Sequence, residues 1–172
     1  MSVKKILTEP NTLLRQVSKS VDKVGDEERA LMDDMLDTMY DAPGIGLAAI
    51  QIGVPKRIIV MDISRDDDKK EPRYFVNPVI KNRNNEKAKY EEGCLSVPDQ
   101  FAEIERPNAC EVEYLDYDGK KKLLKADGLL ATCIQHEMDH LEGILFIDYL
   151  SKLKKSMILK KLSKIKVNRK IF

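Results

Sequence analysis

The sequence predicts an α+β protein, with mainly antiparallel sheets packed around a central helix and an amphipathic helix at the C-terminal end. A helical pattern comes early, short β-like runs fill the middle of the chain, and a strongly apolar helical stretch follows them. Because strands and helices are grouped rather than alternating, the order favours α+β. With 172 residues, 42% hydrophobic and 34% charged, the chain suits one globular domain.

The N-terminal part predicts an extended lead-in at residues 3–8 and a short helical turn that Pro10 and Asn11 open. Asp26 is the expected N-cap of a helix that runs to about Tyr40. Its core-facing side is Met-rich and contains Met32, Met35, Leu36 and Met39.

Two glycines follow this helix in the segment Pro43–Gly46, which ends the helix and begins an extended stretch. A phosphate-binding loop is one interpretation of Gly44 and Gly46, but no Lys or Ser/Thr follows at the required spacing. We therefore expect a backbone that another group approaches closely.

The middle of the chain predicts several strands. Residues 57–63 are rich in β-branched side chains, and residues 74–80 form a strand that Pro78 interrupts, which favours an edge position or a bulge. Residues 101–106 and 109–117 alternate between polar and apolar and are joined through Pro107.

A hairpin and the central helix come next. Asp118-Gly119 is a strong hairpin turn that leads to a strand at 121–125. Asp127 is a plausible N-cap for the central helix, and Gly143 is placed to stop it. Apolar residues cover more than half of its circumference, so we expect it to be buried: Leu129, Leu130, Cys133, Ile134 and Leu141.

The C-terminal region predicts an apolar segment at 144–150 and a final amphipathic helix from about Ser151. Its expected apolar face consists of Leu153, Met157, Ile158, Leu162 and Ile165. Residues 151–172 hold nine of the 30 basic residues and none of the 29 acidic ones, so the rest carries a net charge of −8. We expect residues 1–150 to form a catalytic core and 151–172 a basic helix of the same domain, whose lysines face solvent or an anionic partner.

The strongest chemical signal lies in the central helix. The only two histidines of the chain, His136 and His140, are four residues apart and therefore share one helix face. Two imidazoles so placed bind one metal ion, with Glu137 as a general base for a bound water. A chance match of this short pattern is the competing interpretation, and the scarcity of histidine argues against it.

Sequence spacing alone does not identify the third metal ligand. Phe146 stands where another class of metalloprotease would place a histidine. Glu142 points away from the histidine face, whereas Asp148 remains a candidate.

The cysteines give a further choice. Cys133 lies roughly 10 Å along the helix axis from His140, beyond the reach of its side chain. Cys110 falls in an alternating strand and is expected in the core, while Cys94 lies in a bend between a glycine and a proline. Three cysteines do not make a disulfide framework.

Three segments together resemble the signature motifs of peptide deformylases: GIGLAAIQ at Gly44–Gln51, EGCLS at Glu92–Ser96 and QHEMDH at Gln135–His140. The resemblance extends over nearly the whole chain. It implies that the central helix binds a metal through Cys94, His136 and His140, and that the enzyme removes the formyl group from N-terminal formylmethionine.

The resemblance also implies roles around the metal. Glu137 is the general base, and the Leu95 backbone N–H with the Gln51 side-chain amide stabilises the oxyanion. Five residues match the methionine pocket: Ile45, Tyr90, Leu129, Thr132 and Cys133. The substrate peptide lies beside Ile45 and Gly46 like an added strand, with Glu92 and Gly93 also contacting substrate. Phe101 stands where many bacterial relatives carry arginine.

Cofactor, partners and location follow as further expectations. A Cys-His-His site accepts Zn²⁺, Ni²⁺ or Co²⁺, and the resemblance implies Fe²⁺ in the cell. Partners are nascent peptides and, through the basic C-terminal helix, the ribosome. The sequence shows no leader or span of bilayer length, so we expect a cytoplasmic monomer with no membrane contact.

Two other function classes compete. A zincin-like endopeptidase would cleave internal bonds and would not need Cys94. A metal-stapled RNA-binding module would have a closed four-ligand site and no use for Glu137 as a base. The segment Gly44–Gln51 argues against both, because neither has a use for it.

Overall fold

The computed structural model describes residues 2–64 and 69–171, with the backbone alone described for 165–171. The elements, in chain order, are η1 (Thr12–Arg15), α1 (Asp26–Asp41), β1 (Gly46–Ala48), η2 (Ala49–Ile52), β2 (Ile58–Met61), β3 (Arg73–Arg83), β4 (Lys87–Cys94), β5 (Val97–Pro107), β6 (Ala109–Leu115), β7 (Lys121–Asp127), α2 (Gly128–Leu141), η3 (Phe146–Tyr149) and α3 (Lys152–Ile171). The predicted α+β fold is confirmed.

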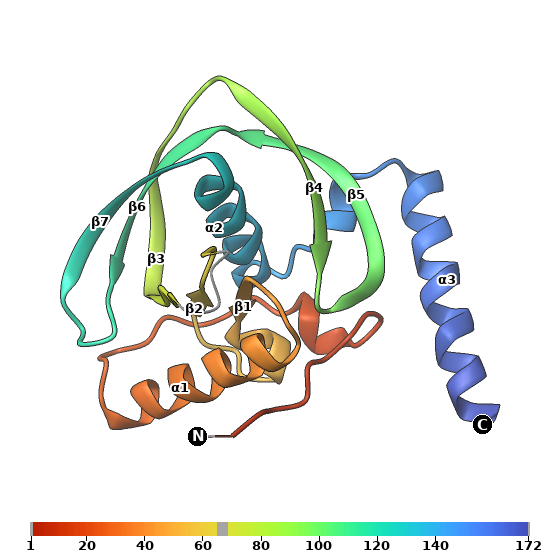
Figure 1. Cartoon of the computed structure of the whole chain (residues 1–172), viewed down its shortest axis with the longest axis horizontal. Helices are drawn as coiled ribbons and strands as arrows, with labels where there is room; N and C mark the ends of the chain where they lie inside the picture. Colours follow the sequence, from red (N-terminus) through yellow and green to blue (C-terminus); the bar gives the residue numbers. More distant parts are fainter. Residues whose placement is uncertain (1, 65–68, 172) are drawn as a thin grey trace.

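Two antiparallel sheets surround α2. One is five-stranded, in the order β1-β2-β3-β6-β7, and the other pairs β4 with β5. Figure 1 shows the chain arching over α2 from β3 to β4 and back from β5 to β6. The β3–β4 and β5–β6 connections are hydrogen-bonded to each other. Asn84 N donates to Ala109 O, and Asn108 N donates to Glu86 O, both at 2.9 Å. The arch thus holds the two sheets on opposite sides of one helix.

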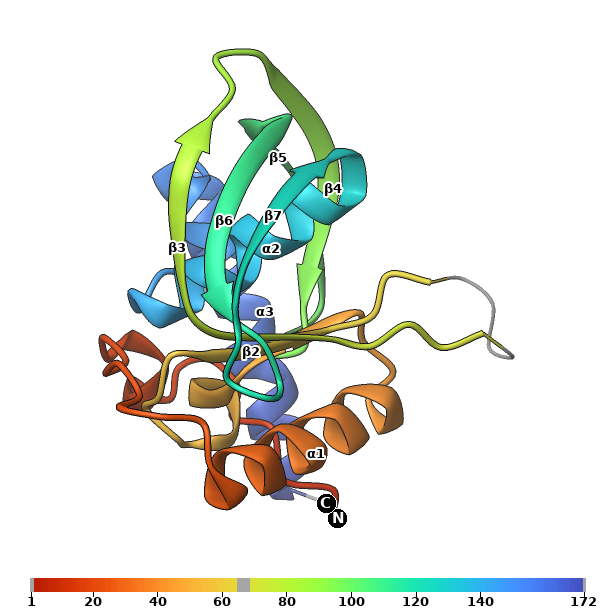
Figure 2. The ribbon, with the colours of Figure 1, turned by 90° about the vertical axis from the view of Figure 1, so that its left-hand side faces the viewer.

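The position of strand β2 explains why its apolar run is continuous. Its residues Ile59 and Met61 pack in the same cluster as Ile134 of α2. The alternate residues Ile58 and Val60 pack with the methionines of α1. Because both faces of β2 are covered, all of its positions are apolar. Figure 2 shows α1 below this part of the sheet and α2 beyond the strands β3, β6 and β7.

The ends of α2 follow the sequence signals. Asp127 occupies the N-cap position, although its side chain makes no capping hydrogen bond. Gly143 has φ +74°, and a Cβ there would lie 2.4 Å from the carbonyl oxygen of Arg15. Only glycine fits, so the helix ends where the N-terminal segment crosses it.

Two predictions about the sheet and α1 need correction. The N-cap of α1 is Gly25 rather than Asp26, and Gly25 N donates to Glu28 Oε1 at 2.9 Å. Of the two alternatives for the strand with Pro78, the edge position is wrong and the bulge is confirmed: β3 is the middle strand of its sheet, and a register shift between Val76 and Val79 accommodates Pro78. Asn77, in the bulge, has φ +50° and bonds through its side-chain amide to the Val21 backbone.

The predicted apolar face of α3 is only half right. Ile158 and Leu162 are buried in a cluster with Val97, Ile104 and Phe146, residues of β5 and η3. Leu153 and Met157 are 72% and 51% exposed, because they lie on a neighbouring strip of the helix that faces away. The side chain of Ile165 lies outside the described residues.

Among the residues that the structure describes, no helix combines the length and apolar character needed to cross a bilayer. The expected lead-in at 3–8 forms no regular strand, but it is fixed at its end. Leu7 N donates to Gln51 O at 2.7 Å, and Glu9 N donates to Ser96 O at 2.8 Å. The N-terminal segment therefore braces two segments that reappear at the functional site.

Candidate metal centre

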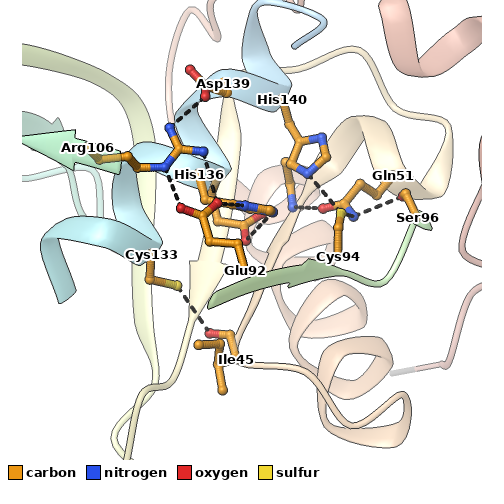
Figure 3. Close-up of polar contacts among 12 residues, drawn as sticks. Ile45, Gln51, Glu92, Cys94, Ser96, Arg106, Cys133, His136, Asp139 and His140 are labelled. Carbon is orange, nitrogen blue, oxygen red and sulfur yellow. Dashed lines mark hydrogen bonds and ion pairs between the residues drawn. The ribbon is translucent and has the colours of Figure 1, made fainter. Parts of the chain in front are cut away.

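Helix α2 and the end of β4 bring together the predicted metal ligands. His136 and His140 face Cys94, the last residue of β4, as Figure 3 shows. Their ligand atoms all lie within 4.8 Å of one another, and Cys94 Sγ lies 3.3 Å from His140 Nε2. One sulfur and two imidazole nitrogens form a donor set that suits zinc and late first-row metals, with a fourth position left for water.

The other ligand candidates are engaged elsewhere. Asp148 forms ion pairs with Arg15 at 2.6 Å and with Lys155 at 2.8 Å. Glu142 pairs with Arg57 on the protein surface. Cys110 is buried in the core beneath α2, as predicted. Of the candidates that spacing left open, Cys94 is thus the one that lies with both histidines.

A buried carboxylate fixes the tautomer of His136. Glu92 Oε1 lies 2.9 Å from His136 Nδ1, which directs Nε2 towards Cys94 and His140. Arg106 donates to Glu92 through Nε at 2.7 Å and Nη2 at 3.0 Å. Burial alone would raise the pKa of Glu92, but the bonds from His136 and Arg106 outweigh it and lower that pKa. Glu92 is therefore an anion that strengthens His136 as a ligand.

The two histidines have opposite electrostatic surroundings. Burial alone would lower the pKa of His136, but Glu137, Cys94 and Glu92 raise it well above 6.5. For His140, burial and then His136 lower the pKa well below 6.5. This pocket therefore favours one positive charge near His136 and a neutral ring at His140.

Glu137 is poised beside the histidines. It is 4% exposed, and Oε2 lies 3.9 Å from His136 Nε2. Within the described residues, Oε1 is buried without a hydrogen-bond partner, as expected of a group that receives a water. Burial raises the pKa of Glu137 to about 7. A carboxylate so tuned can both accept and return a proton near neutral pH.

Glu137 also packs closely against a glycine backbone. A Cβ on Gly46 would lie 2.5 Å from Glu137 Oε2, and one on Gly44 would lie 2.6 Å from Leu95 Cδ1. The prediction that a group approaches these glycines is confirmed for both. The approaching groups are side chains of this chain: the Glu137 carboxylate at Gly46 and the end of the Leu95 side chain at Gly44.

Gln51 lies in η2, buried beside the metal ligands. Its Oε1 accepts from Ala48 N at 2.9 Å, so Nε2 faces Ser96 Oγ at 3.0 Å and Cys94 Sγ at 3.6 Å. Leu95 directly follows Cys94 in the turn between β4 and β5. The amide of Gln51 is thus a preoriented donor at the metal centre.

A cleft of about 540 Å³ opens onto Glu137 and His136. The predicted pocket residues all line it: Ile45, Tyr90, Leu129, Thr132 and Cys133. Gly93 also lines it, and the Phe101 ring lies over Gly93, where a Cβ would come within 2.6 Å of it. Glu92 reaches the cleft but directs its carboxylate at Arg106 and His136, so its side chain supports the metal site rather than a substrate.

Sequence reasoning missed Arg106, Ser96 and Asp139, which complete the polar surroundings. Arg106 Nη1 donates to Asp139 Oδ2 at 2.8 Å. A signal was available for Arg106, since it shares the inward phase of β5 with buried Ile104. A buried arginine in an apolar phase indicates a paired carboxylate.

Comparisons with known proteins agree on one family. Residues 3–156 match the family model of polypeptide deformylase. A peptide deformylase of Pelagibacter ubique is 88% identical over 169 residues, which cover 98% of each chain. The crystal structure of peptide deformylase from Ehrlichia chaffeensis superposes with a TM-score of 0.91 at 43% identity, covering 96% of this chain and 97% of that one. A crystal structure of the Ehrlichia chaffeensis enzyme in complex with actinonin gives the same TM-score at 45% identity. The match covers 95% of this chain and 98% of that one.

Proposed function

The chain belongs to the polypeptide deformylase family, and we propose that Cys94, His136 and His140 hold the single metal ion of its active site. The enzyme hydrolyses the formyl group from N-terminal formylmethionine of nascent polypeptides. We assign this catalytic role to residues 1–150, with 151–172 as a basic helix of the same domain. Fe²⁺ is the metal we propose in the cell, and Zn²⁺, Ni²⁺ and Co²⁺ also suit the ligands.

Glu137 is the proposed general base and acid. When bound, the metal ion acidifies a water molecule and polarises the formyl oxygen. Glu137 accepts a proton as the water attacks the formyl carbon and returns it to the amine as the C–N bond breaks. Formate and a free N-terminus result. The observation that carries this role is Glu137 Oε1, which lies buried next to the ligand set without a hydrogen-bond partner among the described residues.

Two donors are proposed to stabilise the oxygen that gains negative charge. Gln51 Nε2 is held towards Cys94 by the bond between its Oε1 and Ala48 N. The Leu95 backbone N–H is the second donor. Loss of one such donor commonly costs about 3 kcal/mol of transition-state stabilisation.

The substrate is proposed to enter along a free strand edge. Strand β1 is at the edge of its sheet, so an extended peptide can lie beside Ile45 and Gly46. The Ile45 carbonyl already accepts from Asp62 N at 2.9 Å, so Gly46 is the residue whose backbone faces the outer edge. The methionine side chain then enters the cleft between Tyr90, Leu129 and Cys133, with Ile45, Thr132 and Gly93 completing its walls.

The decisive experiment measures formate release from formyl-Met-Ala-Ser, with acetyl-Met-Ala-Ser as control, using protein purified without oxygen. Glu137→Gln should retain metal but lose about 10²- to 10⁴-fold in kcat/KM. No formate from folded, metal-loaded protein would contradict the mechanism. Internal peptide cleavage that survives Cys94→Ala would indicate an endopeptidase instead.

We propose that the protein works in the cytoplasm as a monomer and that its basic helix α3 contacts the ribosome. Lys154, Lys160, Lys161 and Lys164 are exposed on it, without an acidic residue in the helix. Replacing these four lysines by serine should weaken co-sedimentation with ribosomes at low salt and leave hydrolysis of the tripeptide unchanged. Unchanged co-sedimentation would argue against this partner.

A further inference from the structure

The hydrogen-bond network behind His136 continues to the protein surface. From Glu92 it passes to Arg106, whose Nη1 donates to Asp139 Oδ2 at 2.8 Å. Tyr149 of η3 donates its hydroxyl to the same Oδ2 at 2.7 Å. Figure 3 shows Arg106 between Glu92 and Asp139, on the side of His136 away from Cys94.

Arg106 is buried with a carboxylate on each side. It is 5% exposed and Glu92 6% exposed, so its guanidinium has little access to water. The ring of Tyr149 lies against it, with the guanidinium carbon 4.9 Å from the ring centroid. The position of Arg106 is therefore set by Glu92 on one side and by Asp139 and Tyr149 on the other.

Asp139 also shares the charge of Arg106. The guanidinium divides its hydrogen bonds and its field between the Glu92 and Asp139 carboxylates. Without the Asp139 carboxylate, the whole charge falls on Glu92, which then accepts a weaker hydrogen bond from His136 Nδ1. A weaker bond at Nδ1 makes Nε2 a poorer metal ligand.

We propose that Asp139 and Tyr149 are positioning residues for His136, acting through Arg106 and Glu92. The proposal rests on the proposed role of His136 as a metal ligand. Neither residue touches the cleft. Tyr149 is 51% exposed, so water could satisfy its hydroxyl and packing does not require the bond to Asp139.

The test uses Co²⁺ added to metal-free full-length protein, because its absorption bands report ligand geometry. Five proteins are compared: wild type, Asp139→Asn, Tyr149→Phe, the double variant of these two, and the matched control Tyr117→Phe. The control removes another tyrosine–aspartate bond, from Tyr117 to Asp33 at 3.1 Å, which plays no part in the network. The readouts are the Co²⁺ spectrum and the rate at which a chelator removes the ion.

We expect Asp139→Asn to speed Co²⁺ release about tenfold and to shift the ligand-field bands. Tyr149→Phe should do both to a smaller extent, while Tyr117→Phe should match wild type. In the double variant, Tyr149→Phe should add nothing to Asp139→Asn, since Tyr149 acts through Asp139.

Wild-type spectra and release rates in both network variants would overturn the proposal. The proposal would also be overturned if the rate of Co²⁺ release followed the midpoint of thermal unfolding in all variants, including the Tyr117→Phe control. The effect would then be one of general stability. Wild-type protein that binds Co²⁺ without a thiolate charge-transfer band would instead refute the metal site itself. Failure of the network and failure of the proposed function are thus separate results.

Discussion

Helices α2 and α3 differ in what surrounds them, as their sequences predicted for a buried helix and an amphipathic one. In α2, nine of 14 residues are buried, and these include Gln135, His136, Glu137 and His140. In the part of α3 whose side chains are described, the buried residues are Ile158 and Leu162. One helix buries polar groups, and the other leaves apolar groups in solvent.

The arrangement of the sheets explains the difference. Helix α2 runs under the arch between both sheets. It contacts β1, β5, β6 and β7, and side chains of β4 reach its two histidines. Helix α3 lies at the edge of the molecule and packs on β5 and η3 along one strip. Burial on all sides permits a tuned metal site, whereas one-sided packing gives an anchored but solvated helix.

The largest effect is expected where β1 meets α2. Gly46→Ala would place a Cβ against the Glu137 carboxylate and displace it. Because displacement of a reacting group by about 1 Å costs on the order of 10²-fold, kcat/KM for the formylated tripeptide should fall by that amount.

Gly44→Ala is the matched control for this substitution. Its new Cβ would meet the end of the Leu95 side chain, which can rotate away. Formate release by this variant should stay close to wild type. Equal activities of the two variants would show that α2 is less constrained than its burial suggests.

An intermediate effect is expected on the packing of α3. Ile158→Ala removes a buried side chain from the cluster with β5 and should reduce the free energy of unfolding by about 2 kcal/mol. Leu153→Ala removes an exposed one and should change it by less than about 0.5 kcal/mol. Urea unfolding monitored by circular dichroism measures both, and equal losses would mean that α3 packs on both strips.

The smallest effect concerns the charged anchor at the start of α3. Burial alone would raise the pKa of Asp148, but hydrogen bonds from Arg15 and then Lys155 outweigh it and lower that pKa below 3.8. A lowered pKa in the folded protein stabilises it above the unfolded pKa, and the gain is lost as the pH falls through the folded value.

Wild type should therefore exceed Asp148→Asn in stability by about 1 kcal/mol above roughly pH 5, with the difference vanishing towards acid pH. Urea unfolding of the two proteins at pH 7, 5 and 3 tests this. A difference independent of pH would mean that the carboxylate charge plays no part in holding α3.

The sequence by itself predicted features that depend on neighbouring residues. The histidine pair on α2, the stop at Gly143, the hairpin at Asp118-Gly119 and the methionine face of α1 follow from local periodicity and turn chemistry. The resemblance to deformylases added Cys94 and Gln51, which spacing alone left undecided.

Only the tertiary structure decided how distant segments meet. It placed Arg106 of β5 against Glu92 of β4, set Glu137 on the Gly46 backbone and made β3 a central strand despite Pro78. It also left Leu153 exposed in a helix that looked uniformly amphipathic. Periodicity records which residues share a face, but burial and pairing depend on what the rest of the chain brings to that face.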